Sequence, residues 1–587
     1  MKTTSKNAKY LTYKEVSESF VVNRQFRQLI INDSSIIVGP RGCGKTTLLK
    51  MLYPLAYHAN TSDKLRKLYD EMPFWGIYIP ADTEWKEQLE MIRKSDSEYS
   101  ENLVITLISI NILSSIVQCF GDLLQISRDL AKESSKCDIT ISDIDDIEIS
   151  LAKDLIKNWR MPTTVVPTLY EIVQYWTVMT YDIGSMLESN KYNGPIFDGY
   201  SYFMNYAKSA FNAFEQHCSR LSFCAKKNFR WALCFDELEI LPENFRQHIY
   251  KLLRSSLQNV LYKTTSAYLL SDLPDSPTDA AEGQDYSEIF NWVYGEESQK
   301  EWQSFCKELF NKKINGFSKL VGEYDLLKGV KKTSYDGKDY IKGSPTYDIF
   351  TELASKDTSF NNSLKQKGID PQDPYLEQQK EWLKKVKTVA ICRWYHLKNR
   401  EMSPFYFGEE LLYDISEGNP RLAIKILDEI FLEYNKQNGK KTAISPERQS
   451  DIIIFLSKKK KRFLENYPNA VIEKDNKRFS LGDLINIIGS YFSQELYGDT
   501  FQEFPKNTFC YDDRCESILP LIKIGLELGA FIKLQTKESR EQVYKLSYIL
   551  YPCFNLPRRA TVTKYAYLFD ILYPHKSNED QTKLDLQ

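Results

Sequence analysis

Apolar and polar residues along the first half of the chain follow a pattern that predicts a sheet with helices around it. Four apolar runs predict strands: 36–38, 74–80, 231–235 and 260–270. The third run is continuously hydrophobic, which favours a buried parallel strand. Between the second and third runs, residues 84–230 are mostly helical in pattern, with an acidic surface loop or helix start at 138–148. We therefore expect an α/β fold with helical material inserted into a parallel sheet.

Residues 102–121 carry no charge and have the length of a membrane span. However, Asn111, Ser114, Ser115 and Gln118 cluster on one side of a helical wheel. A span needs about 20 predominantly apolar residues, whereas a polar side is typical of an amphipathic helix. We therefore expect a buried helix here rather than a span, and no membrane partner.

The second half of the chain predicts a helical segment followed by a smaller mixed segment. Residues 374–434 have helical periodicity, interrupted at Ser-Glu-Gly-Asn-Pro-Arg, 416–421, where Gly and Asn end one helix and Pro begins the next. Further on, a helix at 518–528 precedes two strands, 531–534 and 543–546. A helix followed by a hairpin is the outline of a winged helix.

Composition limits the classes of protein that fit these patterns. The chain has 587 residues, enough for about three to four domains, of which 42% are apolar and 27% charged, as in an ordinary globular protein. The formal net charge of −2 gives no global attraction for nucleic acid, so any DNA or RNA site must be a local patch.

The stretch GPRGCGKTT carries the strongest chemical signal. Its Gly-x4-Gly-Lys-Thr spacing is that of a phosphate-binding loop, and it lies between an apolar strand and a predicted helix at 47–52, as such a loop requires. We expect Lys45 to reach the β- and γ-phosphates and the hydroxyl of Thr46 to hold Mg²⁺. The expected nucleotide contacts are Gly39, Pro40, Arg41, Gly42, Cys43, Gly44, Lys45, Thr46 and Thr47.

Two carboxylates supply the second half of a nucleoside triphosphatase site. Asp236 and Glu237 follow the apolar run at 231–235, and ligands of open α/β sheets bind where such strands end. We expect Asp236 to hold the Mg²⁺ shell together with Thr46, and Glu237 to polarise the attacking water. Arg421, one residue into the helix that Pro420 begins, points out of its first turn.

Cysteine and histidine usage argues against other metal chemistry. The eleven cysteines include no Cys-x-x-Cys pair, which favours reduced thiols in a cytoplasm over disulfides or a zinc knuckle. The five scattered histidines include no His-Glu-x-x-His, so we expect no metal other than nucleotide-bound Mg²⁺. The first 14 residues lack the apolar core of a signal peptide, and we expect a cytoplasmic location.

GPRGCGKTT, ALCFDELE, EGNPR and the winged-helix outline together resemble the AAA+ ATPases of the origin-recognition and replication-initiator type. The match is nearest to bacterial members of that group, many of which lie in antiphage defence or mobile-element loci. The resemblance implies ATP and Mg²⁺ as cofactors. It also implies three domains: a nucleotide-binding domain at 1–300 with its helical insertion at 84–230, a helical lid at 301–444, and a winged-helix domain at 445–587.

The resemblance also assigns residue roles. Arg421 matches the arginine that swings from the lid onto the γ-phosphate, so Glu237, Lys45 and Arg421 form the expected catalytic set. A polar residue that senses the γ-phosphate is expected at the end of the strand that begins at Val260, with Thr264, Thr265 and Ser266 as open alternatives. The arginine finger of this class is not identifiable. Arg254 is one candidate, and a solvated helix face is the alternative.

Five apolar residues before the phosphate loop have two interpretations. They either pack near an adenine ring or form the core of a leading helix: Phe20, Val21, Phe26, Leu29 and Ile30. Basic residues near the predicted winged helix are also ambiguous, because a charge run is usually a solvated helix face. They are Lys458, Lys459, Lys460, Lys461, Arg462, Lys533, Lys537, Arg540, Lys545, Arg558 and Arg559.

Two classes of function fit these signals. The first is an ATP-hydrolysing switch that couples nucleotide state to recognition of double-stranded DNA or a partner, in antiphage defence by resemblance. The second is a nucleotide-dependent scaffold or oligomerisation protein whose winged helix docks a partner protein. No nuclease, protease or NAD-consuming segment is recognisable, so an effector is expected to be a separate protein. Assembly into a homo-oligomer is left open.

Overall fold

The structure is a computed structural model of the chain. It describes residues 8–81, 100–133, 139–189, 196–197, 199, 201–238, 241–253, 260–266, 286–290, 296–313, 321, 342–372, 377–398, 406–436, 443–468, 470–474, 477–534, 542–558 and 564–574. Internal contacts divide the chain into two compact units. The N-terminal unit comprises residues 6–39 and 44–291, and the C-terminal unit comprises Trp292–Gln587 together with the loop residues Pro40–Cys43.

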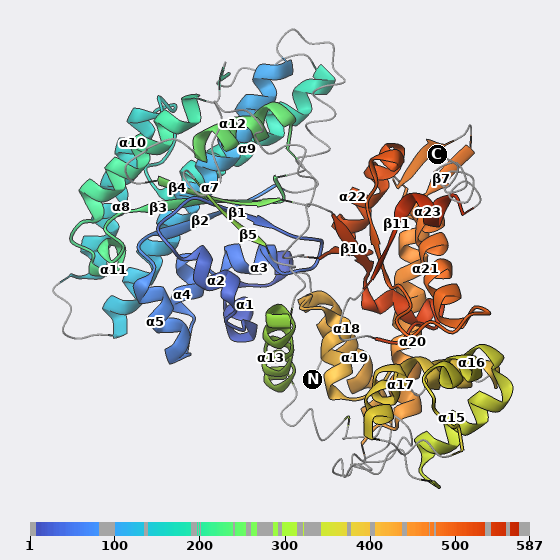
Figure 1. The fold of residues 1–587 in the computed structure, drawn as a ribbon. Helices are drawn as coiled ribbons and strands as arrows, with labels where there is room; N and C mark the ends of the chain where they lie inside the picture. Colours follow the sequence, from blue (N-terminus) through green and yellow to red (C-terminus); the bar gives the residue numbers. More distant parts are fainter. Residues whose placement is uncertain are drawn as a thin grey trace. The chain divides into compact units, whose positions relative to one another are not determined.

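A five-stranded sheet forms the centre of the N-terminal unit, in the order β2-β3-β4-β1-β5 (Figure 1). Every neighbouring pair is parallel. Its strands are β1 (Ser35–Val38), β2 (Trp75–Pro80), β3 (Trp231–Asp236), β4 (Val260–Ser266) and β5 (Ser287–Phe290). The predicted α/β class and its four strands are confirmed. The fifth strand, β5, has only four residues and a mixed pattern, which gave no sequence signal.

Helices cover both faces of this sheet. Figure 1 shows α2, α3 and α4 on one side of the strands and α9 and α12 on the other. The helices before the insertion are α1 (Tyr13–Ser19), α2 (Arg24–Leu29), α3 (Lys45–Lys50), α4 (Pro54–His58) and α5 (Asp63–Glu71), with a 3-10 helix, η1, at Ala8–Tyr10. The others are α7 (Ser100–Glu133), α8 (Ile141–Asn158), α9 (Leu169–Ser189), α10 (Ser201–Cys218), α11 (Ser222–Ala225) and α12 (Glu243–Leu253).

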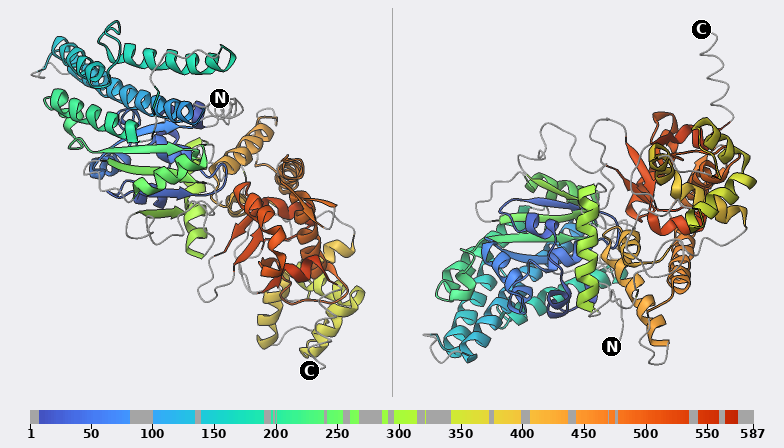
Figure 2. Two further views of the ribbon diagram at one scale, coloured as in Figure 1. Left: turned by 90° about the horizontal axis from the view of Figure 1, so that it is seen from above. Right: turned by 60° about the horizontal axis from the view of Figure 1, so that its bottom comes forward.

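The segment predicted as a helical insertion, 84–230, is mostly helical within its described residues. Its long helices run side by side in Figure 2. Helix α8 begins inside the acidic segment, where Thr140 and Asp143 form a capping box, so that segment starts a helix. Helix α7 contains the uncharged stretch, and its portion Glu101–Glu133 is long and apolar enough to cross a membrane. Of its most apolar window, 78% is buried inside the protein, as expected for a core helix.

The C-terminal unit begins with helices. They are α13 (Glu296–Lys313), α15 (Pro345–Lys356), α16 (Thr358–Gln366), α17 (Glu377–Leu397), α18 (Glu409–Ser416), α19 (Pro420–Lys436), α20 (Pro446–Glu465) and α21 (Leu481–Tyr497). The predicted break is confirmed, because α18 ends at Ser416 and α19 begins at Pro420. The segment 322–345, whose richness in Gly and Lys predicts a linker or flexible loop, lies mostly outside the described residues.

A four-stranded sheet follows, in the order β11-β8-β10-β9. Its elements are β8 (Thr508–Cys510), η5 (Asp513–Ile518), α22 (Leu519–Glu527), β9 (Phe531–Lys533), β10 (Val543–Leu546), η6 (Tyr548–Phe554), β11 (Tyr565–Tyr567) and α23 (Leu568–Leu572). A separate pair joins β6 (Val471–Lys474) to β7 (Lys477–Ser480). The predicted helix and its antiparallel pair β9–β10 are present. Strands β8 and β11, of three residues each, gave no sequence signal. The winged-helix assignment and the three-domain boundaries stay predictions.

Candidate nucleotide-binding site

The loop between β1 and α3 has the backbone that its glycines predict. Gly42 has φ 90° and Gly44 has φ 95°, values in the left-handed region that favours glycine. Gly44 is the N-cap of α3, so the helix begins at Lys45, two residues earlier than the predicted Thr47. The Lys45 ammonium donates to the carbonyl of Gly39, which folds the side chain back over the loop. An incoming phosphate oxygen would replace that carbonyl as the partner of Lys45.

The tip of the loop makes its contacts within the C-terminal unit. Arg41 donates its main-chain N–H to the carbonyl of Glu527 at 2.9 Å, and its Nε lies 3.2 Å from the Glu527 carboxylate. The main-chain N–H of Arg421 donates to the carbonyl of Gly42 at 3.3 Å. A Cβ added to Gly42 would lie 3.0 Å from Cβ of Arg421, so glycine is required both by φ and by this close approach.

Asp236 is the last residue of β3 and is buried, with 3% of its surface exposed. Both of its carboxylate oxygens accept hydrogen bonds. The Tyr78 hydroxyl donates to Oδ2 at 2.8 Å, while the Thr265 hydroxyl and the main-chain N–H of Glu237 each donate to Oδ1 at 3.1 Å. These bonds fix the orientation of the carboxylate at the C-terminal edge of the sheet.

Glu237 has an unusual backbone. Its φ of 55° lies in the left-handed region, which non-glycine residues seldom occupy outside sites where the surroundings impose it. Here the Thr265 hydroxyl accepts the main-chain N–H of Glu237 at 2.8 Å. The chain therefore turns sharply after Asp236, and the two consecutive acids leave the strand in different directions.

Strand alternation separates the three residues that the sequence left open at the end of β4. Thr265 contacts both acids through its hydroxyl. The buried hydroxyl of Thr264, on the opposite face of β4, has no hydrogen-bond partner within the described part of the chain. The carbonyl of Ser266 accepts the N–H of Gly39 at 3.3 Å, which ties β4 to the start of the phosphate loop. Of the three candidates, Thr265 is therefore the residue whose hydroxyl faces Asp236 and Glu237.

The chain offers oxygen ligands that suit Mg²⁺. Thr46 lies in the first turn of α3 and is half-buried, and Oδ2 of Asp236, which accepts only the Tyr78 hydroxyl, keeps a second lone pair. Hydroxyl and carboxylate oxygens are the hard ligands that Mg²⁺ prefers, usually completed by phosphate oxygens and water. Across the described ranges, no three His, Cys, Asp or Glu side chains gather into a metal site of their own.

The turn that contains Glu417 orients the first residues of α19. Glu417 and Gly418 have φ values of 49° and 73°, which reverse the chain after α18. The Asn419 side chain accepts the main-chain N–H of Leu422 at 3.1 Å and so caps α19, and Pro420 is its first residue. Arg421 is exposed on the first turn, four residues before Lys425. Its contact with a γ-phosphate stays a prediction.

The structure bears on two further sets of residues that the sequence left open, the apolar residues before the phosphate loop and the arginine-finger candidate. The five apolar residues before the loop, Phe20 to Ile30, are each at most 6% exposed, and Phe26 packs edge-on against Phe20 and Tyr69. This packing favours the core alternative over an adenine contact. Arg254, the arginine-finger candidate, lies outside the described residues.

Several of the basic residues singled out in the sequence have internal partners. The Lys460 ammonium donates to the carbonyl of Leu528 at 2.6 Å, and Lys461 pairs with Glu465 at 3.4 Å. Lys545 pairs with Glu417, and Arg558 with Asp414. Exposed basic side chains on α20 are Lys458, Lys459 and Arg462. Residues Lys537, Arg540 and Arg559 lie outside the described residues. The basic patch is therefore smaller than the sequence suggests.

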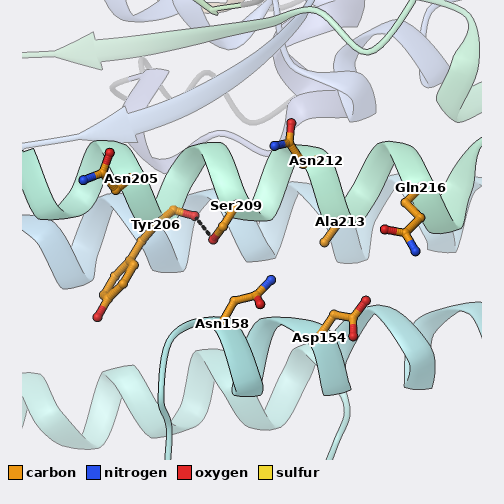
Figure 3. Close-up of a pocket in the computed structure, with 8 residues that line it drawn as sticks. All are labelled: Asp154, Asn158, Asn205, Tyr206, Ser209, Asn212, Ala213 and Gln216. Atoms are coloured by element: carbon orange, nitrogen blue, oxygen red, sulfur yellow. Dashed lines mark hydrogen bonds between the residues drawn. The ribbon is translucent and has the colours of Figure 1, made fainter.

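A polar pocket of about 390 Å³ lies elsewhere, between α8 and α10 (Figure 3). Figure 3 shows Asp154 and Asn158 on α8 facing polar side chains of α10, where the Ser209 hydroxyl donates to the carbonyl of Tyr206 at 2.8 Å. Much of its lining is exposed amide side chains, including Asn205, Asn212 and Gln216. None of the predicted site residues lines this pocket.

Comparison with known proteins gives one family. A family model described as ORC-CDC6-like matches residues 1–563, nearly the whole chain. The chain therefore belongs to the ORC-CDC6-like family, which confirms the resemblance to origin-recognition-type AAA+ proteins and agrees with the helix-flanked parallel sheet. Neither the curated proteins nor the solved structures give a match.

Proposed function

We propose that this member of the ORC-CDC6-like family is an ATP-binding and ATP-hydrolysing switch. The observation that carries the proposal is the hydroxyl of Thr265, which bonds both Asp236 and the main chain of Glu237. Together with the bond from Gly39 to Ser266, it joins the end of β4 to the acids on one side and to the phosphate loop on the other. Loop and acids thus share one edge of the sheet, as a triphosphate site requires.

Each residue has a role that follows from its position. Lys45 leaves the Gly39 carbonyl to bind the β- and γ-phosphates, and the loop N–H groups bind phosphate oxygens. Thr46 and Asp236 would hold Mg²⁺, which neutralises charge on the phosphates when it is bound. Glu237 orients and polarises the attacking water. Arg421, at the start of α19, would contact the γ-phosphate through its guanidinium.

Hydrolysis removes the group that Arg421 would share with Lys45, so the state of the nucleotide would change the position of α19. We propose that this change controls recognition of double-stranded DNA or of a separate effector protein, in the cytoplasm. The exposed cations Lys458, Lys459 and Arg462 on α20 support a contact with phosphates. A role in antiphage defence is part of the same proposal and rests on the sequence resemblance.

The test is ATP turnover and ATP binding by the purified chain and two variants. Lys45→Ala should abolish tight ATP binding, whereas Glu237→Gln should bind ATP and stop turnover, because only the second variant spares the phosphate contacts. Assays with and without duplex DNA would reveal coupling, and any DNA effect should weaken steeply with added salt. A Glu237→Gln variant with the parental rate would show that the base is assigned wrongly.

A scaffold or oligomerisation protein is the second candidate. Helix α22, which occupies the position of a recognition helix in the proposed winged helix, is largely apolar and buried. Its charged residues are Lys523 and Glu527, and Glu527 is engaged by Arg41. Such a helix favours a structural or protein-docking role over base readout. ATP-dependent assembly by size-exclusion chromatography, without any response of turnover to DNA, would favour this candidate.

A further inference from the structure

We propose that Tyr78 is a positioning residue for the metal-binding acid: its phenol O–H holds the Asp236 carboxylate in the orientation that receives Mg²⁺ with ATP. This inference rests on the proposed function and adds to it a residue of β2. Tyr78 lies in the strand predicted at 74–80, to which the sequence assigned no site residue.

The register of the sheet brings the two side chains together. Tyr78 lies opposite Cys234 in the parallel pair of β2 and β3, and Asp236 lies opposite Pro80. The phenol reaches along the strand by two residues, and its hydroxyl donates to Oδ2 of Asp236 at 2.8 Å. Both groups are buried, with 9% of Tyr78 and 3% of Asp236 exposed. A phenol carries its proton at neutral pH, so it donates this bond to the carboxylate.

Neighbouring strands hold the carboxylate at both oxygens. Tyr78 of β2 binds Oδ2, and Thr265 of β4 binds Oδ1, together with the main-chain N–H of Glu237. Rotation of the carboxylate about its Cβ–Cγ bond would break bonds at both ends. Oδ1 accepts two hydrogen bonds, whereas Oδ2 accepts one and keeps a lone pair for a metal or a metal-bound water. Partners of this kind orient ligating groups, and their removal typically weakens metal affinity about 10- to 100-fold.

The Tyr78 ring is itself held in place by Lys50 of α3. The Lys50 ammonium lies 5.6 Å from the ring centroids of both Tyr78 and Tyr13. It donates to the carbonyls of Ala8, Lys9 and Leu11 at 2.9 to 3.0 Å. A buried ammonium with three carbonyl partners has little freedom to move. Its cation–π contact therefore restrains the Tyr78 ring. Residues 8–11 thereby contribute to the geometry at Asp236.

The test measures the Mg²⁺ dependence of nucleotide binding rather than activity. A fluorescent ATP analogue is titrated into the full chain at a series of Mg²⁺ concentrations and in excess EDTA. Tyr78→Phe should raise the Mg²⁺ concentration needed for half-maximal tightening about 10- to 100-fold. Affinity in EDTA should not change, because the phosphate loop is untouched.

Tyr262→Phe is the matched control. Tyr262 is a fully buried tyrosine of β4 in the same sheet, and its hydroxyl faces the sulfur of Met204 at 3.6 Å, away from Asp236. It should show the parental Mg²⁺ dependence. A second arm places Tyr78→Phe in an Asp236→Asn background, where it should cause no further change if it acts through that carboxylate.

The outcomes separate this inference from the proposed function. A parental chain that takes up no ATP analogue in any condition would overturn both. A parental chain with Mg²⁺-dependent binding and a Tyr78→Phe variant that matches it would overturn the role of Tyr78 alone. An additional loss from Tyr78→Phe in the Asp236→Asn background would also overturn it, because the tyrosine would then act through another group.

Discussion

Glu417 and Lys545 form an ion pair in which neither side chain reaches solvent, with 0% and 1% of the respective side chains exposed. The Glu417 carboxylate also accepts the Ser547 hydroxyl at 2.5 Å and the main-chain N–H of Tyr548 at 3.1 Å. Burial raises the pKa of Glu417 and lowers that of Lys545 to about 8, and each charge opposes the shift of its partner. The buried Glu417 carboxylate thus accepts hydrogen bonds from three donors of the C-terminal unit, on Lys545, Ser547 and Tyr548.

This pair joins the turn before α19 to strand β10. A second pair joins Asp414, in the last turn of α18, to Arg558, which follows η6. Arg421 follows Glu417 by four residues, and its main-chain N–H bonds the carbonyl of Gly42 in the phosphate loop. Arg421 therefore follows closely a turn that the buried Glu417–Lys545 pair ties to β10.

Removing one partner of the pair should destabilise the C-terminal unit strongly. Lys545→Met leaves the Glu417 carboxylate buried without its countercharge, and such losses cost about 3–5 kcal/mol. Urea unfolding, followed by hydrogen exchange of β10 peptides, measures the effect. The double variant with Glu417→Gln should recover most of the loss. If Lys545→Met and Glu417→Gln, each made alone, both unfold at the same urea concentration as the parental chain, the pair contributes nothing to stability.

Thr265→Val should slow turnover without weakening ATP binding at saturating Mg²⁺. The substitution keeps the shape of the side chain but removes the hydroxyl that holds Asp236 and the main chain of Glu237. We expect kcat to fall about 10- to 100-fold while KM changes little, since the phosphate loop is unaffected. Thr265→Ser keeps the hydroxyl and should retain most activity. Thr264→Val, on the opposite face of the same strand, is the matched control. An equal loss from Thr264→Val would argue for a packing effect instead.

Gly42→Ala should weaken ATP binding by disturbing both the loop and Arg421. Alanine at φ 90° costs about 1–2 kcal/mol, and its Cβ would press against Cβ of Arg421 at 3.0 Å and Oδ1 of Asn419 at 3.2 Å. Equilibrium titration with an ATP analogue measures the loss, which we expect to be at least about tenfold for 1.4 kcal/mol of strain in the bound loop. Gly368→Ala is the control, because Gly368 has φ 65° with open space around its Cβ. It should leave ATP affinity unchanged, and an equal loss there would contradict a local effect.

The lowered pKa of Lys460 should make the folding stability of the chain depend on pH. Burial, together with the charges of Lys425 and Arg421, lowers its pKa to about 8, against about 10.4 in an unfolded chain. Between those two values the unfolded chain binds a proton that the folded chain has released, so this group favours folding increasingly as pH rises above about 8. The melting temperature of the parental chain, relative to that of Lys460→Met, should therefore rise between pH 7.5 and 10.

Lys459→Met serves as the control for the loss of a charge on α20, because Lys459 lies on the exposed surface of the same helix. A melting-temperature difference between Lys460→Met and the parental chain that stays constant over this pH range would contradict the lowered pKa. The measurement also bears on DNA contact, because a Lys460 that bonds the Leu528 carbonyl is not available to phosphates.

The sequence by itself determined the features that depend on neighbouring residues. Gly42 and Gly44 set the loop backbone, the apolar run before Asp236 made a buried strand, and Pro420 began a helix. Each of these follows from local conformational preference or from burial of a short run, which a few adjacent residues fix. The predicted placement of the phosphate loop and the acids at strand ends followed from the same local signals.

Only the tertiary structure decided which distant side chains meet. Strand order and register selected Thr265 over Thr264 to face the acids and brought Tyr78 to Asp236, 158 positions away. Packing buried Lys545 in β10, and it turned Lys460 inward although the run of lysines at 458–461 is typical of a solvated surface. The partner of Lys545, Glu417, is 128 positions away. Such pairings depend on how the whole chain folds back on itself, because no local preference encodes a contact across that separation.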